Sequence, residues 1–458
     1  MSVDKLALIM AAGEGTRMLS NLPKVLHAVC GQPIVEHVLR AVDSVCKQKV
    51  LIVGHGKERI MEACHGQADF VEQQPGGWGT GHAIRSAASM LEGKKGAVLI
   101  TAGDMPLVLP ETYARLVSEV EKGYAAAMLT DYVDNPTGYG RVVRENGRVC
   151  AIVEQKDLVG EQHNIKEMNA SVYCFDIESL LWALPQLKNN NGAHEYYLTD
   201  VISILYQGGK HITTVPVLEK SECCGINNRL QLAQAEREMR RRINARHMRA
   251  GVTMIDPETT YIEPDVSIGR DTIVYPGCVL QKGTVIGENC LLLPNCRIMG
   301  SRVGDNVRIE NSVLLDATVG SNTTVGPFAY IRPDTVVGEK CRVGDFVELK
   351  NSNIGDGTKI AHLTYVGDSD LGEKVNLGCG TVFVNYDGKN KNRSIVGDGA
   401  FIGCNVNLIS PVNVGTDAYI AAGSTITEDV PDGAMAIARE RQSIKEDWVS
   451  KRKMEGKL

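Results

Sequence analysis

The sequence predicts two halves of different fold class, an α/β domain with a mostly parallel sheet and a parallel β-helix, joined by a single helix. Three observations predict this. Short apolar runs alternate with helix-like stretches over residues 3–227, residues 228–249 contain neither glycine nor proline, and aliphatic residues recur every six positions from Ile262 onward. A chain of 458 residues is long enough for two or three domains. We place their boundaries at 1–227, 228–250 and 251–458.

The first half is predicted to consist of buried strands interleaved with helices. The runs at 6–13, 49–56 and 96–104 are short and apolar, and each ends in glycine or aspartate. Helix-like stretches such as 32–47 and 81–91 lie between or after them. This alternation is typical of a mostly parallel sheet with helices on both faces. Ligands of such sheets bind beyond the carboxyl ends of the strands, so the residues that end these runs are candidates for chemistry.

Residues 228–249 predict the connecting helix. They are rich in helix-forming residues, and Gly251 follows as a plausible stop. The arginines of this segment suggest two interpretations, a nucleic-acid contact or a solvated helix face. Glu236 and Glu238 are interspersed among the arginines, which favours the solvated face.

The second half is a hexapeptide repeat of the parallel β-helix type. Each aliphatic residue is expected to fill the interior, while glycine, aspartate or asparagine accept the turn geometry at the corners. Because one coil can bury its face only against the next, the coils must stack. The series runs through Ile262, Ile268, Val274, Leu280, Ile286, Leu292 and Ile298, then Val303, Ile309 and Leu315, then Val319, Val325, Ile331, Val337, Val343 and Leu349, and finally Val396, Ile402, Leu408, Val414, Ile420 and Ile426.

Composition excludes several classes of protein. The net charge of −6 gives no reason to expect a nucleic-acid partner. The first residues are not a signal peptide, because Asp4 precedes a short apolar run that leads into a glycine turn, and no stretch approaches the roughly 18 apolar residues of a membrane span. Thirteen cysteines without an export signal, a CxxC pair or zinc-ligand spacing favour free thiols in a reducing cytoplasm.

The repeat accounts for several cysteines as small core residues. Cys278, Cys290, Cys296 and Cys341 each stand four places after an inward aliphatic, where other coils have threonine, serine, valine or alanine. Cys278 and Cys296 are 18 residues apart, which is one coil of three hexapeptides. We therefore expect these two residues to stack in neighbouring coils and to remain reduced thiols.

The glycine-rich stretch 8–24, "LIMAAGEGTRMLSNLPK", follows a predicted strand and is expected to lead into a helix. Gly13 and Gly15 let the backbone approach an anion, and Arg17 and Lys24 add charges suited to a polyphosphate. The spacing matches neither GxGxxG nor the Walker A pattern. The stretch resembles the nucleotide-sugar pyrophosphorylase family, which joins a sugar phosphate to a nucleoside triphosphate and releases pyrophosphate. The resemblance implies a Rossmann-like nucleotidyltransferase domain.

Further motifs of the first half fit the same family. "QQPGGWGTGHA" (73–83) resembles its base-recognition stretch, and "AGDMPL" (102–107) places an aspartate at a strand end. The resemblance implies that Arg17 and Lys24 stabilise the departing pyrophosphate and that Asp104 and Asn227 bind Mg²⁺. The positions that it assigns to the nucleotide sugar are Met10, Ala11, Ala12, Gly13, Lys24, Gln74, Gly79, Thr80, Gly140, Glu154, Asn169 and Asn227.

A break in the repeat marks a second candidate site. The six-residue step shortens to five after Leu349 and after Val366, and ten residues, 385–394, are inserted before the count resumes. Polar residues gather there, among them His362, which follows the inward Ile360. Alone, this histidine is more simply a surface residue at a coil corner. Together with its polar neighbours it is a candidate general base near neutral pH.

The motifs "YIRP", "FVELK", "AHLTYVGD", "NLGCGT", "NYDG" and "IAAGSTIT" closely resemble the bifunctional N-acetylglucosamine-1-phosphate uridyltransferase/glucosamine-1-phosphate acetyltransferase family, over nearly the whole chain. The resemblance implies a homotrimer of left-handed β-helices, with acetyl-transfer sites between them, that uses acetyl-CoA, UTP and Mg²⁺. It makes His362 the base for acetyl transfer. It assigns the acetyl acceptor to Arg332, Lys350, Tyr365 and Asn376, and acetyl-CoA to Cys379, Asn385, Tyr386, Cys404, Ala422 and Arg439.

Two positions depart from that family. Relatives usually have alanine where this chain has Cys379 and serine where it has Cys404. Backbone contacts would survive both changes, but a thiol is a poorer hydrogen-bond donor than a hydroxyl. We hypothesise that thiols beside coenzyme A make acetyl transfer sensitive to oxidants and alkylating agents.

Three functions remain open at this point. The leading one is acetylation of glucosamine-1-phosphate followed by uridylyl transfer, which yields UDP-N-acetylglucosamine for cell-envelope polymers. A single-activity sugar nucleotidyltransferase with a β-helix used for assembly or regulation would leave the polar cluster at 332–386 unexplained. A repeat scaffold without activity conflicts with the glycine-rich loop and Asp104.

Overall fold

The computed structural model describes residues 4–74 and 78–458. Residues 75–77 belong to the stretch 73–83 that resembles a base-recognition segment, so that part of the prediction lies outside the described residues. Among the described residues, no helix combines the length and the apolar composition needed to cross a lipid bilayer.

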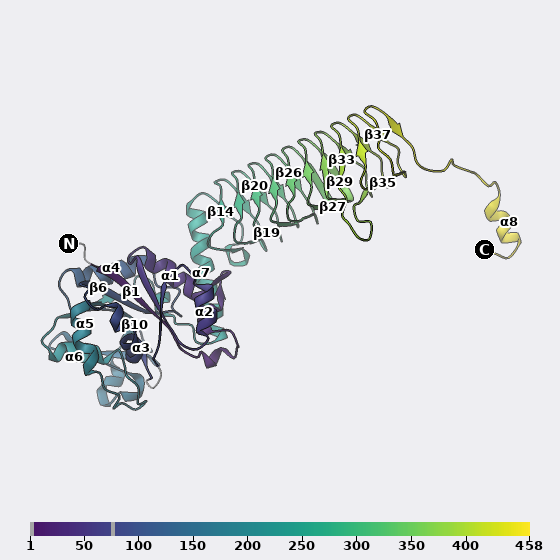
Figure 1. Cartoon of the computed structure of the whole chain (residues 1–458). Helices are drawn as coiled ribbons and strands as arrows, with labels where there is room; N and C mark the ends of the chain where they lie inside the picture. Colours follow the sequence, from purple (N-terminus) through teal and green to yellow (C-terminus); the bar gives the residue numbers. More distant parts are fainter. Residues whose placement is uncertain (1–3, 75–77) are drawn as a thin grey trace. The chain divides into compact units, whose positions relative to one another are not determined.

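The chain divides into two compact units, Met1–Arg240 and Arg241–Leu458. The division lies within α7 (Arg229–Arg249), where the sequence predicted the connecting helix (Figure 1). The functional boundaries at 227 and 250 remain our proposal. A short helix, α8 (Trp448–Met454), follows the last coil of the second unit.

The first unit is built on a mixed nine-stranded sheet in the order β11-β7-β10-β6-β1-β4-β5, with β8 paired to β10 and β9 paired to β8. The three predicted buried runs are β1 (Asp4–Ala11), β4 (Gln48–Val53) and β6 (Gly96–Ala102), and both β4 and β6 pair with β1 in parallel. The remaining strands are β5 (Asp69–Glu72), β7 (Ala126–Tyr132), β8 (Gly140–Glu145), β9 (Arg148–Val153), β10 (Glu167–Asp176) and β11 (Ile212–Pro216).

Helices cover both faces of this sheet, as the sequence predicted. Alternate residues of β1 belong to two separate apolar clusters, with Ile9 in one and Leu8 in the other, because successive strand side chains point to opposite faces. The helices are α1 (Ile34–Asp43), α2 (Lys57–Ala63), α3 (Thr80–Ser86), α4 (Pro110–Glu121), α5 (Ile177–Ala183) and α6 (Asp200–Gln207).

Two local predictions for this unit are wrong. The helix expected over 32–47 is shorter, because Gln32–Pro33 forms the strand β3 and Pro33 precedes the first helical residue. The glycine-rich stretch leads into two 3₁₀ turns, Thr16–Met18 and Lys24–Leu26, and not into an α-helix. Leu19 ends the first turn with a φ of 48°, which a continuing right-handed helix does not allow.

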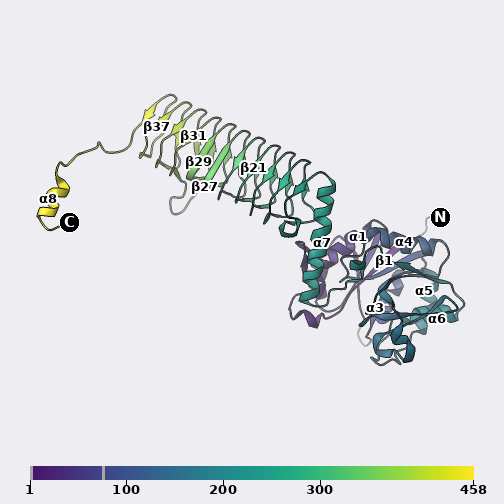
Figure 2. The same cartoon turned by 180° about the vertical axis from the view of Figure 1, so that it is seen from behind.

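The second unit is a stack of coils, as predicted. One ladder has 19 strands, from β12 (Thr253–Met254) to β39 (Met435–Ala436), and another has nine, from β14 (Ser267–Ile268) to β36 (Asn413–Val414). The coils follow one another along the axis of the stack (Figure 1), and the view from behind shows the same order (Figure 2). All pairings between successive coils in these ladders are parallel.

The interior of the stack consists of the predicted aliphatic series, except that Ile268 in the first coil is only half-buried and that one coil needs a correction of register. Leu314 is fully buried and pairs with Ile298, whereas Leu315 is half-buried. The six-residue count therefore fails here, since this coil is 16 residues long by the pairing of Ile298 with Leu314. The four core cysteines of the repeat are buried, and Cys278 and Cys296 are neighbours in adjacent coils without a disulfide, as expected.

Candidate active sites

The first candidate site is a cavity of about 860 Å³, a size typical of small-molecule sites, at the carboxyl ends of β1, β4 and β6. Ten of the residues predicted for this site line it: Met10, Ala11, Ala12, Gly13, Lys24, Gln74, Gly79, Thr80, Asp104 and Glu154. Arg17, Gly140, Asn169 and Asn227 do not line it.

The glycine-rich loop positions Lys24. Gly15 has a φ of +64°, and a Cβ there would lie 2.7 Å from the Cβ of Lys24. Any larger residue would displace the lysine side chain as well as strain the backbone. Gly15 is thus required by the close approach of Lys24, which the sequence alone did not reveal.

Lys24 joins two oxygen-bearing side chains at the edge of the cavity. Its ammonium group forms an ion pair with Asp104 and donates to Asn227 Oδ1 at 3.2 Å. Arg17 Nη2 donates to the same Asn227 oxygen at 2.9 Å. The backbone supports this arrangement, because the Ile226 amide donates to the Asp104 carbonyl at 3.0 Å. The structure therefore brings together the four residues predicted for phosphate and metal binding.

Glu154 also lines the cavity. Burial raises the pKa of this carboxyl, and Thr199 Oγ1 donates to it at 3.3 Å. Gly140 lies beside it, where a Cβ would approach Ile152 Cγ2 to 2.9 Å. Asn169 pairs with Gly140 across the strands, but its amide donates to the Tyr173 hydroxyl at 2.7 Å.

Gly79 and Thr80 hold the start of α3 against the segment 195–198. Gly79 has a φ of +98°, and a Cβ there would lie 2.5 Å from the Tyr196 carbonyl oxygen. Thr80 Oγ1 accepts from the Leu198 amide at 3.1 Å. Both residues therefore have a structural reason to be present, in addition to lining the cavity.

The second candidate site is a column of equivalent turns on successive coils. In each turn a glycine or alanine precedes a central residue, and a residue with positive φ follows. The central residues are Asp345, His362, Cys379, Cys404 and Ala422, and the residues with positive φ are Phe346, Leu363, Gly380, Asn405 and Gly423. Constant strand register before and after each turn places the central residues one above another.

His362 and Asp345 are a hydrogen-bonded pair within this column. His362 Nδ1 lies 2.7 Å from Asp345 Oδ1, and the hydrogen bond from His362 lowers the pKa of Asp345. Because an ionised carboxylate only accepts hydrogen bonds, Nδ1 carries the proton and Nε2 keeps a free lone pair. The His362 side chain is 53% exposed and that of Asp345 is 39% exposed. The pair can therefore take a proton from a molecule bound beside the turn.

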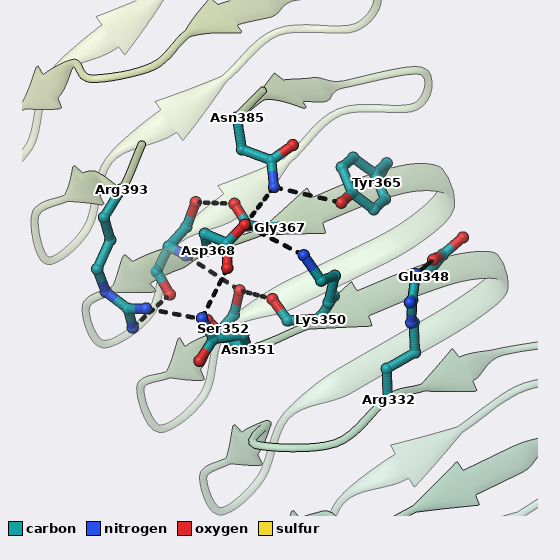
Figure 3. A network of polar contacts seen from close by, with 11 residues as sticks. Arg332, Glu348, Lys350, Asn351, Ser352, Tyr365, Gly367, Asp368, Asn385 and Arg393 are labelled. Carbon is teal, nitrogen blue, oxygen red and sulfur yellow. Dashed lines mark hydrogen bonds and ion pairs between the residues drawn. The ribbon is translucent and has the colours of Figure 1, made fainter. Parts of the chain in front are cut away.

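One of the predicted acetyl-acceptor residues, Lys350, contacts a buried carboxylate, Asp368, on the next corner of the coils (Figure 3). Lys350 Nζ lies 3.3 Å from Asp368, and Asn351 donates to it at 2.6 Å. Asn385 donates to Asp368 and also reaches the Tyr365 hydroxyl at 3.4 Å. Burial would raise the pKa of Asp368, but the hydrogen bonds from Asn351, Asn385 and Lys350 lower it overall.

Cationic groups gather on the same side of the stack. Arg332 pairs with Glu348 at 2.8 Å and stands apart from Asp368 in Figure 3. Lys391 in the inserted loop has a lowered pKa because the Lys350 side chain lies beside it. Two neighbouring ammonium groups repel each other unless an anion lies between them, so this cluster is suited to a phosphate.

The residues predicted for acetyl-CoA are divided between the column and the inserted loop. Cys379, Cys404 and Ala422 continue the column beyond His362, and the Arg439 side chain lies close to Gly423 on the last of these turns. Tyr386 lies in the loop and is exposed, with its hydroxyl donating to the Gly388 carbonyl at 2.6 Å. Asn376 pairs with Lys359 in the register between β29 (Lys359–Gly367) and β31 (Asn376–Leu377).

Sequence reasoning missed Asp345, Asp368 and Lys391. A signal for Asp345 did exist, because it precedes His362 by 17 residues and the nearby inward residues Val343 and Ile360 differ by the same number. Asp368 carried no such signal, since aspartates are common at coil corners and its burial depends on the inserted loop.

Comparison with known proteins identifies related families for both units. Residues 7–241 match the MobA-like NTP transferase domain. Residues 316–351 and 393–428 match the bacterial transferase hexapeptide repeat, and residues 283–317 match the hexapeptide repeat of succinyl-transferase. The chain is 51% identical over 449 residues to the bifunctional protein GlmU of Clostridium kluyveri, covering 97% of this chain and 98% of the relative. The GlmU proteins of Clostridium beijerinckii and Clostridium acetobutylicum are also 51% identical, over 98% of this chain and 99% of each relative.

The chain belongs to the GlmU family. It is a bifunctional transferase of UDP-N-acetylglucosamine synthesis, as the sequence resemblance implied. Membership also agrees with a left-handed β-helix for the hexapeptide repeats. Its substrates are small molecules, a nucleotide and acetyl-CoA among them. Both GlmU activities therefore need a site in this chain, and the cavity and the turn column are the two candidates.

Replacing Asp368 tests the role of the buried carboxylate. In Asp368→Asn, Lys350 loses its partner, so we expect a loss of stability of about 2 kcal/mol and a lower rate of acetyl transfer. The pKa of Asp368 is lowered in the folded protein, so its ionised carboxylate adds to the free energy of unfolding of the wild type. This contribution is present above the usual aspartate value of 3.8 and is lost as the pH falls through the folded-state pKa. Thermal melts at pH 7 and pH 3 measure this. Asp370→Asn is the matched control, because Asp370 pairs with Arg393 on the outside. Equal melting curves for wild type and Asp368→Asn at pH 7 would contradict the assignment.

Proposed function

We propose that the turn column catalyses acetyl transfer from acetyl-CoA to glucosamine-1-phosphate and that the cavity of the first unit then joins the product to UMP from UTP. The observation that carries this proposal is the Asp345–His362 pair, with its 2.7 Å hydrogen bond on the surface of a structural repeat. A β-helix that serves only as a scaffold has no use for an oriented imidazole beside a cationic cluster.

In the first reaction His362 is the general base. The amine of the sugar attacks the thioester carbonyl carbon, a C–N bond forms, the C–S bond breaks, and coenzyme A leaves as a thiol. Nε2 takes the proton that the amine loses, while Asp345 keeps the imidazole in the required tautomer and stabilises the imidazolium. Arg332, Lys350 and Lys391 supply the positive charge that holds the phosphate of the acceptor.

The acceptor and the coenzyme are held by neighbouring groups. Tyr365 and Asn376 bind the sugar phosphate, and Asn385, linked to Tyr365 through its amide, lies between the two substrates. Tyr386, Cys379, Cys404, Ala422 and Arg439 bind acetyl-CoA.

In the second reaction the sugar phosphate attacks the α-phosphorus of UTP in line and pyrophosphate leaves. Arg17 and Lys24 stabilise the charge that develops on the pyrophosphate, since Lys24 lines the cavity and Arg17 donates to the same Asn227 oxygen as Lys24. The uracil base lies against Gln74, Gly79 and Thr80. The sugar is held by Glu154 in the cavity, together with Gly140 and Asn169 on the strands beside it.

The residues present fit a magnesium ion. Asp104 and Asn227 bring a carboxylate and an amide oxygen to the same cation, the Lys24 ammonium group, so a hard cation finds oxygen ligands there. No group of three or more acidic, histidine or cysteine side chains gathers as a metal site within 4–74 and 78–458, which agrees with an ion that takes its other ligands from phosphates and water. When bound, the ion would neutralise charge on the reacting phosphates.

We also propose a homotrimer in the cytoplasm. Phe328, Phe346 and Leu363 have positive φ, lie on the turns beside His362 and are 56%, 59% and 59% exposed. The two phenyl rings stack at 5.3 Å. Strained, exposed apolar side chains at a candidate site favour cover by a second copy of the chain. The thirteen cysteines, none of which is in a disulfide, favour a reducing compartment.

Asp104→Ala is expected to impair uridylyl transfer and to leave acetyl transfer intact. The variant loses the carboxylate proposed to hold Mg²⁺, so uridylyl transfer should fall by roughly 10³-fold. Acetyl transfer should stay at the wild-type rate. Pyrophosphate release and formation of acetylated sugar measure the two reactions separately. Asp69→Ala, at an exposed position of β5, is the control. Normal uridylyl transfer by Asp104→Ala would refute the metal assignment.

His362→Ala is expected to impair acetyl transfer and to leave uridylyl transfer intact. Loss of the base should lower kcat of acetyl transfer by roughly 10²- to 10⁴-fold and leave uridylyl transfer from supplied N-acetylglucosamine-1-phosphate unchanged. His163→Ala, exposed in the first unit, should change neither. Wild-type acetyl transfer by His362→Ala would contradict the assignment of His362 as the general base.

A further inference from the structure

The turn column contains two cysteines in consecutive positions. β31 pairs with β34 (Phe401–Ile402) so that Leu377 lies opposite Ile402, and the next pairing along, between β32 (Val382–Val384) and β35 (Asn407–Ile409), keeps the same offset. Cys379 therefore lies beside Cys404 on adjacent coils. The Asn405 amide donates to the Cys379 carbonyl at 2.7 Å, which fixes the two turns against each other.

The two thiols point out from turns of the same form. Each cysteine follows a glycine and precedes a residue in the left-handed region, Gly380 at 77° and Asn405 at 54°. Equivalent turns on neighbouring strands place their Cα atoms about 4.8 Å apart with parallel Cα–Cβ bonds. That separation is within the range that two linked cysteines span, about 4.4–6.8 Å.

Exposure distinguishes this pair from the other stacked pair in the coils. Cys278 and Cys296 have the same register, but both are 0% exposed and both thiols donate to the Leu293 carbonyl, at 3.2 and 3.1 Å. The hydrogen bond with the Cys278 thiol and burial raise the pKa of Cys296. Cys379 and Cys404 are exposed. The buried pair is therefore closed to reagents, and the exposed pair is open.

We propose that Cys379 and Cys404 form a paired-thiol site for thiophilic centres that take two sulfur ligands, such as monosubstituted trivalent arsenic, and that its occupation stops acetyl transfer. No group of three or more cysteine, histidine or acidic side chains among the described residues is placed to hold a metal, and His362 neighbours Cys379 but lies two coils from Cys404, so a centre with two open valences fits better than a four-coordinate metal. With an arsenoxide R–As=O, two S–H bonds break, two As–S bonds form, and the two protons leave with the oxygen as water.

The link to acetyl transfer follows from the same column. Cys379 is the next central residue after His362, so its coil lies one spacing, roughly 4.8 Å, from the coil of the imidazole, and a group bridging the two sulfurs lies between one and two spacings away. This part of the inference rests on the proposed function of His362. Uridylyl transfer should continue, because its proposed site lies within the other compact unit.

The full-length protein treated with phenylarsine oxide tests the site directly. Intact-mass measurement should find one arsenical per chain that survives washing with 2-mercaptoethanol and is removed by 2,3-dimercaptopropanol. Peptide mapping should locate it on Cys379 and Cys404. Either Cys379→Ala or Cys404→Ser should lose the adduct, and Cys224→Ser, at the remaining exposed cysteine of the described chain, should keep it.

Activity is followed by chromatography of the acetylated sugar, because thiol dyes would react with the reagent. Acetyl transfer by the treated wild type should fall at least tenfold relative to the untreated protein, with uridylyl transfer unchanged. The Cys379→Ala/Cys404→Ser double variant, compared with its own untreated activity, should resist the reagent.

Two results would overturn the inference: an adduct of equal stoichiometry in the double variant, or unchanged acetyl transfer in a wild type that carries the adduct. The mass measurement does not depend on catalysis. If His362→Ala kept its acetyl transfer, the proposed function would fail while the test of the thiol pair stood.

Discussion

The second unit depends on one constraint, the parallel register between successive coils. Each coil buries its aliphatic residues only against its neighbours, and burial of each such side chain is worth about 1.5–3 kcal/mol. A slip of one residue would turn the inward side chains outward, so the register is firmly held. Consequently the corner positions are also fixed, and side chains a coil apart in sequence lie one above another. Asp345 and His362 meet because Val343 and Ile360 are packed inside.

The two units place functional groups by different means. In the first, several strands end at one edge of a sheet, and loops from distant parts of the sequence enclose a cavity. Close backbone approach matters there, as Gly15 shows beside Lys24. In the second, no enclosed cavity is needed, because a column of turns presents its residues at a regular spacing. The inserted loop adds Asn385, which connects the buried Asp368 with Tyr365.

Sequence patterns predicted the elements better than the contacts between them. The six-residue period predicted the coils, the buried cysteines and the neighbouring positions of Cys278 and Cys296. It failed at Leu315, because one coil is shorter and Leu314 points inward. To predict which residues pair with the candidate residues, the length of each coil is needed as well as the six-residue period. Asp345 was therefore missed as the partner of His362. The buried environment of Asp368 could not be predicted, since it depends on how the inserted loop folds back onto the coil.

The role of the Asp345–His362 pair is the central claim, and the pH dependence of kcat/KM for acetyl transfer in Asp345→Asn tests it most directly. An asparagine keeps the shape of the side chain but lacks the charge that holds the tautomer and stabilises the imidazolium. We expect kcat and kcat/KM to fall at least tenfold across the pH range and KM for acetyl-CoA to change by less than about twofold. A wild-type profile and rate in Asp345→Asn would contradict the account, because the histidine would then need no carboxylate beside it.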